Sequence, residues 1–286
     1  MTHDDRSVQV PGASLRVVID APDDLDEASG SAAAPPITLL ASALVSLEAW
    51  DDVTPFLVAA GYRVVRYDYR GFGASATDPV EFSNRDDLRA VLDALGIERT
   101  AVVGNSYGAM IALDTVLESP ERFVAMAWVG GGIGGFDGGD SEEELALYRT
   151  YEEAEEAGDI ETMADVDVRI WVDGVGQRSD RVPDAIREAV RRMDRPHVDP
   201  KRVLGTPIPL EPRANERLAS LAIPTLVVIG ELDTQGTRAA AARLATTATQ
   251  ARLVSWPDVA HMIGMEQPER LAGALIDFLA PLPRWR

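Results

Sequence analysis

The sequence of 286 residues contains no cysteine and a single lysine, Lys201. Without cysteine there can be no disulfide bond, no thiolate nucleophile and no cysteine-ligated metal. Positive charge is scarce, because 27 basic residues stand against 47 acidic ones and give a net charge of −20. A chain with this charge repels phosphate groups at long range, so we expect no binding to nucleic acid.

Long hydrophobic runs are also missing. No apolar stretch reaches the ~18 residues that a membrane-spanning helix needs, so we expect no membrane contact. The first residues, Met1–Arg6, lack the basic and then apolar pattern of a signal peptide. These absences predict a soluble cytoplasmic protein. What the sequence does have is 46% hydrophobic residues, enough for a large core.

Short apolar runs alternate with amphipathic segments along most of the chain. Ser7–Val10 and Leu15–Ile19, separated by Pro11-Gly12, predict a hairpin, and Ala21–Pro36 predicts a loop rich in Asp, Ala, Ser and Pro. After this loop, strands separated by single helices predict an α/β fold with a mostly parallel sheet and helices on both faces. The predicted strands are Ile37–Ala41, Arg63–Tyr67, Thr100–Val103, Phe123–Val129, Pro224–Ile229 and Arg252–Ser255. The predicted helices are Glu48–Ala60, Arg85–Leu95, Ala109–Leu117, Thr237–Ala245 and Pro268–Leu279.

The alternation of strands and helices stops after Phe123–Val129, the sixth strand of the predicted main sheet. Residues 130–139 include seven glycines, and the segment that follows is helical in pattern, with Ser141 and Glu144 as a capping box. An insertion at this point would cover the carboxyl ends of the strands, where open α/β sheets bind ligands. We therefore predict a first core segment of residues 1–136, a helical cap or lid of residues 137–212, and a second core segment of residues 213–286.

The segment with the clearest chemical meaning is Thr100–Ala109, which reads T-A-V-V-G-N-S-Y-G-A. It contains a G-x-S-x-G motif between a predicted strand and a predicted helix, the context of a nucleophile elbow. Ser106 stands at the apex, and the glycines on either side leave room for a sharp turn. The helix that follows directs its positive end toward the site. The pattern predicts Ser106 as a catalytic nucleophile.

A serine nucleophile needs a general base to remove its proton, and the chain has three histidines. His3 lies at the terminus, and His197 lies in what reads as a proline-bounded loop of the cap. His261 follows the last predicted strand, where the chain order Ser, Asp, His places the base. We therefore predict His261 as the general base.

The third member of such a site is an acid that orients the imidazole. Asp233 ends the strand before the last one and precedes His261 by 28 residues, so both lie on neighbouring loops at the carboxyl ends of strands. We predict Asp233 as the acid. The competing acids are Glu231 nearby and Asp137 in the glycine-rich segment.

Acyl transfer also requires two N–H donors for the oxyanion of the tetrahedral intermediate. The backbone N–H of Tyr107, directly after the nucleophile, is the first expected donor. The second is expected from the loop after the first core strand, and we assign it to Ala43. The expected walls of the substrate pocket are large side chains of the cap together with the residue that follows His261, namely Tyr148, Tyr151, Met163, Trp171 and Met262.

Taken together, these segments resemble α/β-hydrolase-fold serine hydrolases over residues 37–129 and 222–279. Three further motifs support the resemblance: D-x-R-G-x-G-x-S at 68–75, I-P-x-L at 223–226 and W-D at 50–51. Within the family, Arg63–Asp68 and the lack of a His-Gly pair near Ser42 are similar to 3-oxoadipate enol-lactonase-like members. The resemblance implies hydrolysis of a small-molecule carboxylic ester or lactone through an acyl-enzyme, without metal or organic cofactor.

Other functions stay open. A carbon–carbon bond hydrolase of the same fold fits Gly104-Asn105-Ser106, although such enzymes often carry Trp soon after the histidine, where this chain has Met262. A cofactor-free perhydrolase can share the catalytic residues, and a non-catalytic small-molecule receptor can share the fold. Whether the chain forms a homodimer is also open.

The charge of the substrate can be argued from two sides. The net charge of −20 repels anions, but salt screens it beyond about 10 Å, and the enol-lactonase resemblance implies a carboxylate-bearing lactone. The candidate cationic partners share their segment with acids and are expected to pair with them, so we expect a neutral, largely apolar substrate. These arginines are Arg187, Arg191, Arg192 and Arg195, and the acids are Asp184, Glu188 and Asp194.

Overall fold

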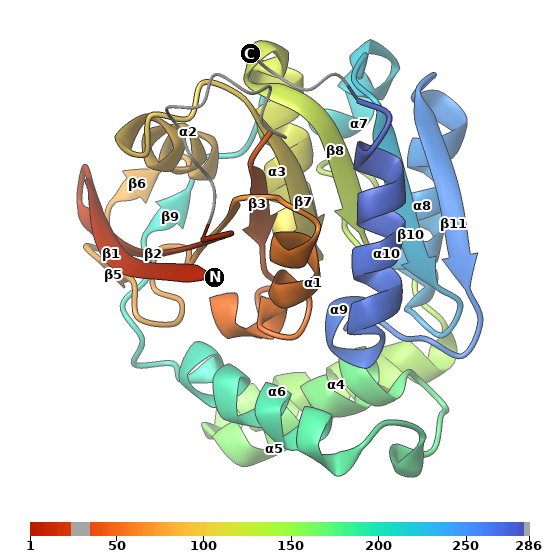
Figure 1. The fold of residues 1–286 in the computed structure, drawn as a ribbon. Coiled ribbons are helices and arrows are strands. Elements are labelled where there is room, and N and C mark those ends of the chain that lie inside the picture. Colours follow the sequence, from red (N-terminus) through yellow and green to blue (C-terminus); the bar gives the residue numbers. More distant parts are fainter. Residues whose placement is uncertain (24–34, 283–286) are drawn as a thin grey trace.

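The computed structural model describes residues 1–23 and 35–282. Within these residues, a nine-stranded sheet has the order β1-β2-β4-β3-β7-β8-β10-β11, with β5 paired to β2 (Figure 1). The hairpin strands β1 and β2 run antiparallel to their neighbours, and the strands from β4 to β11 are parallel. The strands are β1 (Thr2–Val10), β2 (Ala13–Ala21), β3 (Ile37–Leu40), β4 (Val64–Tyr67), β5 (Ala76–Thr77), β7 (Thr100–Asn105), β8 (Phe123–Val129), β10 (Thr225–Gly230) and β11 (Ala251–Trp256).

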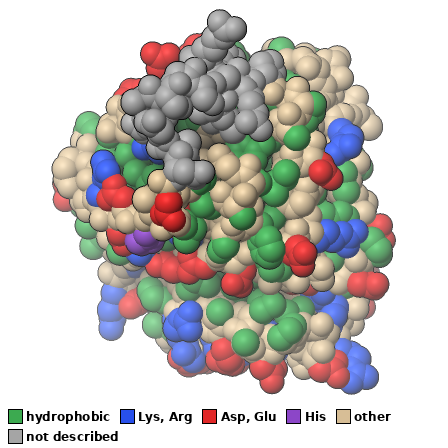
Figure 2. Space-filling model, in the orientation of Figure 1, with side chains coloured by type: hydrophobic (Ala, Val, Ile, Leu, Met, Phe, Trp, Pro, Cys, Tyr) green, Lys and Arg blue, Asp and Glu red, His purple; other side chains and the backbone are tan. Residues whose placement is uncertain are grey.

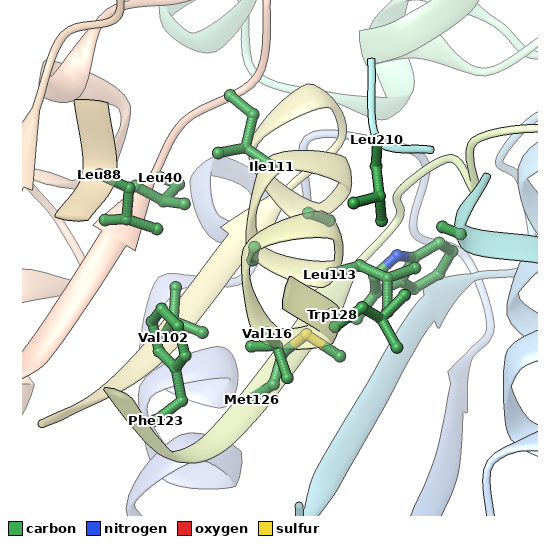
Figure 3. Close-up of a cluster of buried hydrophobic side chains, with 14 of the residues drawn as sticks. Leu40, Leu88, Val102, Ile111, Leu113, Val116, Phe123, Met126, Trp128 and Leu210 are labelled. Atoms are coloured by element: carbon green, nitrogen blue, oxygen red, sulfur yellow. The ribbon is translucent and has the colours of Figure 1, made fainter. Parts of the chain in front are cut away.

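The helices of the core cover both faces of this sheet, as the sequence predicts. Buried side chains of α2, α3 and α8 form one apolar cluster with the sheet, and those of α1, α9 and α10 form another on the opposite face. Figure 3 shows the first cluster around α3, where Ile111, Leu113 and Val116 lie beside side chains of β7 and β8. These helices are α1 (Thr54–Ala59), α2 (Asn84–Ala94), α3 (Tyr107–Glu118), α8 (Gln235–Thr247), α9 (Ile263–Glu266) and α10 (Pro268–Leu279).

Two predicted elements differ from the structure. The predicted helix Glu48–Ala60 is instead a 3₁₀ turn, η1 (Leu47–Trp50), and a separate helix, α1, with Pro55 in its first turn. Proline lacks an N–H and fits the start of a helix better than its interior, which explains the break. Strand β1 begins at Thr2, five residues before the predicted start. The prediction missed these residues because the first half of the strand is exposed and lacks the apolar alternation that marks a strand.

A layer of helices follows β8 and lies across the end of the sheet toward which the parallel strands point (Figure 1). The predicted capping box is confirmed, with Ser141 and Glu144 bonded reciprocally to each other's backbone. Val168, Val172 and Val190 of this layer join the apolar cluster of α1 and α10. The helices are α4 (Glu142–Ala157), α5 (Ile160–Asp167), the π-helical η3 (Val168–Asp173), the 3₁₀ turn η4 (Ser179–Arg181) and α6 (Asp184–Val198).

Helix α6 corrects one interpretation of the sequence. We expected His197 in a proline-bounded loop, but the helix continues through Pro196 and ends at Val198. A proline in the last turn disturbs few of the helix's hydrogen bonds, and the buried side chain of His197 packs against Phe72 with 4.6 Å between ring centroids. The domain boundaries at residues 137 and 212 stay a prediction.

The remaining short elements lie between the longer helices and strands. Most of the predicted loop Ala21–Pro36 lies outside the described residues.

Among the residues that the structure describes, no helix is both long enough and apolar enough to cross a membrane. Acidic and basic side chains are interspersed on the helical layer at the bottom of Figure 2. The cytoplasmic location stays a prediction. The other elements are β6 (Glu81–Phe82), β9 (Thr206–Pro207), η2 (Pro120–Arg122), α7 (Ala214–Arg217) and η5 (Leu218–Ser220).

Candidate active site

The G-x-S-x-G segment forms a sharp turn between β7 and α3. Ser106 has φ 57° and ψ −117°, a left-handed conformation that is strained for a residue with a side chain. Its N–H donates to the carbonyl of Val129 at 3.0 Å, and its own carbonyl accepts from the N–H groups of Ala109 and Met110. These bonds fix the strained backbone and place the serine at the carboxyl edge of the sheet.

The two glycines of the motif are required by space. A Cβ on Gly104 would lie 2.3 Å from the carbonyl oxygen of Gly108, and a Cβ on Gly108 would lie 2.4 Å from the carbonyl oxygen of Leu40. Both distances are far below van der Waals contact. Strand and helix can therefore meet at Ser106 only with glycine at both positions, which is the reason that the motif predicts the turn.

Asp233 and His261 form a buried pair beside the elbow. The His261 Nδ1 atom lies 3.0 and 2.9 Å from the two carboxylate oxygens of Asp233, and the Thr234 N–H also donates to this carboxylate at 2.7 Å. The acid holds the proton of the imidazole on Nδ1, which leaves Nε2 as the basic nitrogen. Nε2 is buried and has no hydrogen-bond partner among the described residues. This is the arrangement that an oriented general base requires, and the role of His261 as the base stays a prediction.

Gly130 lies against this pair. It has φ +50°, and a Cβ at this position would lie 3.1 Å from the Asp233 carboxylate and 3.5 Å from His261 Nδ1. A larger residue would crowd the bond between acid and base. The first glycine after β8 is thus required by the site.

Asn105 connects the nucleophile turn to the histidine loop, a role that the sequence analysis missed. Its side-chain amide donates to the carbonyl of His261 at 3.3 Å and to that of Val129 at 3.1 Å. The residue before Ser106, at the end of β7, therefore holds the backbone of His261, which lies in the loop after β11. The only signal in the sequence was its place in the motif.

The expected oxyanion donors lie in loops beside the elbow. Tyr107 is the first residue of α3, so its N–H has no carbonyl one turn earlier in the helix to bond. After β3, the Leu44 N–H donates to the Ser42 hydroxyl at 3.4 Å, and the Val45 N–H donates to the Ser42 carbonyl at 3.3 Å. Ala43 lies between them and Ser42. The N–H groups of Ala43 and Tyr107 stay predicted donors.

The competing acids and histidines lie elsewhere. Glu231 is exposed and accepts from the Ser255 hydroxyl at 3.0 Å, and Asp137 accepts from the nearby Gly139 N–H at 2.8 Å. His3 pairs with Asp20 in the N-terminal hairpin at 2.8 Å. His197 accepts from the N–H of Gly73 at 3.3 Å, and burial lowers its pKa to about 4. Each of these four residues is thus bonded to a group other than Ser106 or His261.

One expected pocket residue touches the base directly. The ring of Trp171 lies 4.5 Å from that of His261 between centroids, and its indole N–H donates to Asp167 at 3.1 Å. Trp171 belongs to η3, and π-helical turns frequently occur at functional sites. Trp171 therefore covers His261 from the side of the helical layer.

The other four expected pocket residues are half-buried or buried in the interior. Tyr148 and Tyr151 of α4 are half-buried and pack against Val166 and Ile170. Burial, assisted by acids that include Asp233, raises the pKa of Tyr148 to about 12. The two methionines, Met163 in α5 and Met262 after the base, are buried and contribute to packing of the interior.

A cavity of about 320 Å³ opens beside the elbow, at the side of α3. Tyr107 and Met110 line it, and the Tyr107 hydroxyl accepts from the side chain of Asn84 at 2.7 Å. Asp114, one turn further along α3, also lines this cavity, and burial raises its pKa to about 6. In the part of the chain that the structure describes, no group of three or more His, Asp or Glu side chains is placed to hold a metal ion.

The arginines of α6 pair largely as expected, although not always with the expected acids. Arg187 bonds Asp173 at 2.9 Å, Arg191 bonds Asp165 at 2.8 Å and Arg195 bonds Glu161. Arg191 also bonds Glu188, as predicted.

Asp194 is an exception. It is 1% exposed, and its carboxyl lies beside the carboxyl of Asp167 rather than in an ion pair with an arginine of α6. The expectation that it pairs with an arginine of its own helix is therefore wrong. The physical reason is its position on the buried face of α6.

Comparisons with known proteins identify the family to which the chain is similar. Residues 40–274 match the model of the Alpha/beta hydrolase family. The 2-hydroxy-6-oxononadienedioate/2-hydroxy-6-oxononatrienedioate hydrolase of Paraburkholderia xenovorans (strain LB400) is 30% identical over 233 residues, 78% of each chain. Among solved structures, an enol-lactonase from Burkholderia xenovorans LB400 has a TM-score of 0.74 at 20% identity, covering 96% of this chain and 100% of its own. An N-acyl homoserine lactone degrading enzyme has a TM-score of 0.71 at 25% identity, with 96% and 100% covered.

Proposed function

Since the chain belongs to the Alpha/beta hydrolase family, we propose that it hydrolyses a small-molecule carboxylic ester or lactone through an acyl-enzyme on Ser106. The observation that carries the proposal is the strained Ser106 turn beside a buried base, His261, which Asp233 orients at 2.9 Å. A serine at such a turn is exposed to a carbonyl above the sheet, and a neutral imidazole can accept its proton.

The proposed steps follow from these positions. His261 Nε2 removes the proton of the Ser106 hydroxyl as its oxygen attacks the carbonyl carbon. The oxyanion that forms accepts hydrogen bonds from the N–H groups of Tyr107 and Ala43. Protonated His261, stabilised by Asp233, then donates its proton to the leaving alkoxide. Water enters, His261 removes its proton, and the acyl-enzyme is hydrolysed by the same sequence.

The second candidate is hydrolysis of a carbon–carbon bond. It is favoured by the 30% identity to the Paraburkholderia dienedioate hydrolase over 78% of both chains. The Gly104-Asn105-Ser106 start of the elbow also fits this chemistry. Such enzymes often carry tryptophan soon after the histidine, whereas this chain has Met262 directly after His261. We therefore place ester or lactone hydrolysis first.

A substrate panel separates the two candidates. We expect 4-nitrophenyl esters and small lactones of graded size to be hydrolysed with higher kcat/KM than 2-hydroxy-6-oxo-6-phenylhexa-2,4-dienoate, which a relative from Comamonas testosteroni is named for. The opposite preference would favour the carbon–carbon bond hydrolase.

The nucleophile is tested separately. A fluorophosphonate is expected to label Ser106 and no other residue. Ser106→Ala should fold normally and lose about 10³–10⁶-fold in kcat, whereas Ser255→Ala, a control on β11, should keep its activity. Labelling at another serine, or an active Ser106→Ala variant, would rule out the mechanism.

A further inference from the structure

Arg181, the last residue of η4, binds the end of η3. Its Nε and Nη2 atoms donate to the carbonyls of Asp173 and Val172 at 2.7 and 2.5 Å. The last carbonyls of a helix have no partner within the helix, so these bonds satisfy acceptors that would otherwise need water. They also hold η3 in place, and with it Trp171, whose ring lies 4.5 Å from that of His261 between centroids.

The Nη1 atom of the same arginine reaches the loop that carries the proposed base. It donates to the carbonyl of Asp258 at 2.9 Å and to the carboxylate of Glu266 at 2.5 Å. The other carboxylate oxygen of Glu266 accepts from the N–H of Ala260 at 3.0 Å, and Ala260 directly precedes His261. Arg181 is therefore bonded to the chain on both sides of His261, and through Glu266 to the residue next to it.

Two features of this loop depend on such a partner. Asp258 has φ 59°, in the left-handed region that residues with a side chain seldom adopt and that persists only where neighbouring groups fix it. The side chain of Glu266 is 4% exposed, and a buried carboxylate is costly unless it is paired and hydrogen-bonded. Arg181 supplies a hydrogen bond to the first residue and an ion pair to the second. A guanidinium can do both because its five N–H donors form a rigid fork.

The orientation of His261 depends on the backbone of this loop as well as on its ring contacts. Asp233 orients the ring through Nδ1, and the Asn105 amide holds the His261 carbonyl at 3.3 Å. The backbone that precedes the histidine is held by the Glu266 carboxylate. A general base must lie within hydrogen-bond reach of the proton that it removes, and a displacement of about 1 Å can cost about 100-fold in rate.

We propose that Arg181, acting through Glu266, is a positioning residue for His261. This role rests on the proposed function, in which His261 is the general base. It gives the helical layer a part in orienting the reacting groups, because η3 and η4 are attached to the loop of the base by one side chain.

Kinetics of Arg181→Gln with 4-nitrophenyl acetate test this role. We expect kcat to fall by about 10–100-fold while KM changes by less than about threefold, because the variant displaces the base and removes no group that touches the ester. Arg181→Lys should restore part of the loss, since an ammonium keeps the charge beside Glu266 but lacks the fork that reaches all four acceptors. An unchanged kcat, or a loss that lies in KM alone, would overturn the proposal.

The matched control is Arg178→Gln, which removes a neighbouring arginine that is 85% exposed and pairs with Asp180. Its kcat should stay within about twofold of the unmodified protein, because an exposed ion pair contributes little. Circular dichroism and urea unfolding check that each variant is folded. If Arg181→Gln does not fold, Arg181→Lys and Glu266→Gln provide the same comparison.

Glu266→Gln tests whether the two residues act as a unit. The amide oxygen can still accept from the Ala260 N–H, but the ion pair with Arg181 is lost, so the loss in kcat should be close to that of Arg181→Gln. The double variant should then be no worse than either single variant, because residues that act through one another are not additive. Losses that multiply in the double variant would show that Arg181 acts independently of Glu266 and would contradict the proposal.

A spectroscopic measurement does not depend on turnover. The Nδ1 proton of His261, bonded to Asp233, should give a proton NMR signal downfield of the backbone amides, and Asp233→Asn should remove it. We expect Arg181→Gln to broaden or abolish this signal, because a loosened ring exchanges its proton with water faster, whereas Arg178→Gln should keep it. A loss in kcat with an unchanged signal would also overturn the proposal.

The two measurements together separate this proposal from the proposed function. If no ester or lactone is hydrolysed but the signal depends on Arg181, the positioning role stands and the hydrolase mechanism fails. If esters are hydrolysed and Arg181→Gln changes neither kcat nor the signal, the mechanism stands and the positioning role is wrong. If nothing is hydrolysed and the signal is unchanged in Arg181→Gln, both are wrong.

Discussion

At the scale of single residues, Asp233 is distinguished from Glu231 by the direction in which its side chain points. The two acids are two positions apart at the end of β10, yet only Asp233 is buried against His261. Glu231 faces Ser255 on the surface at 3.0 Å. This contrast offers a matched pair of variants for testing the orientation of the base.

We expect Asp233→Asn to lower kcat by about 10³–10⁴-fold, because an amide can stabilise the wrong imidazole tautomer and cannot stabilise the imidazolium. Glu231→Gln should stay within about twofold, because an exposed side chain that contacts neither reacting group contributes little. Steady-state kinetics with one chromogenic ester, together with circular dichroism to check folding, provide the measurement. A dead Glu231→Gln variant beside an active Asp233→Asn variant would reverse the assignment.

Local spacing in the sequence predicted three site residues. Ser106 was chosen for its flanking glycines, and Asp233 and His261 for their positions after predicted strands. The structure brings Asp233 and His261 together at 2.9 Å, and the catalytic roles of all three stay a prediction. Asn105 was not recognisable as a link to His261, because that bond joins residues 156 positions apart.

At the scale of elements, the regular parts of the fold were predictable and their junctions were not. The strands of the parallel sheet carry near-continuous apolar runs, and the Ser141–Glu144 capping box marks the start of α4. That box also has a long-range role, because the second carboxylate oxygen of Glu144 accepts from the N–H of Gln235 at 2.7 Å, two residues after Asp233. Helix α4 is thereby attached beside the acid of the site. No local pattern could indicate that contact.

The contact between η3 and His261 leads to a prediction about this helical layer. Trp171→Ala should change the relative kcat/KM of short and long acyl esters by about tenfold, because it opens space beside the base without removing a reacting group. Trp171→Phe should shift this ratio less, since it keeps a ring over His261 and loses only the bond to Asp167. A panel of 4-nitrophenyl esters from acetate to decanoate measures the ratio. The same proportional loss for every ester would indicate a structural role for Trp171.

At the scale of the whole molecule, the net charge of −20 adds to the cost of ionising a buried acid. Many acids lie on the surface, some of them paired with arginines, but others are buried, and for these the charged form is unfavourable. Asp68 is one, with its pKa raised to about 6 by burial even though it accepts hydrogen bonds from the N–H groups of Leu47 and Ala74. Asp114 is only half-buried, yet burial also raises its pKa to about 6, and it lines the cavity beside the elbow.

Asp114 gives a prediction about stability against pH. Burial raises its pKa from the ordinary value of 3.8 to about 6, so the folded protein holds a proton between these values that the unfolded chain has released. Stability associated with the neutral carboxyl is therefore fully present below pH ~4 and is lost as pH rises through ~6. Asp114→Asn removes this loss. It should raise the free energy of unfolding at pH 8 by about 1–3 kcal/mol and leave it nearly unchanged at pH 4.

The control for Asp114→Asn is Asp52→Asn, which removes one negative charge from an exposed position. If relief of the overall negative charge were the cause of any gain, both variants would be stabilised alike, and added salt would reduce the gain in both. If desolvation of Asp114 is the cause, only Asp114→Asn gains stability at pH 8, and the gain persists at high salt because a buried group is screened little. Urea unfolding of the three proteins at pH 4 and pH 8, each at low and high salt, distinguishes the two causes. An equal gain for both variants would assign the effect to net charge.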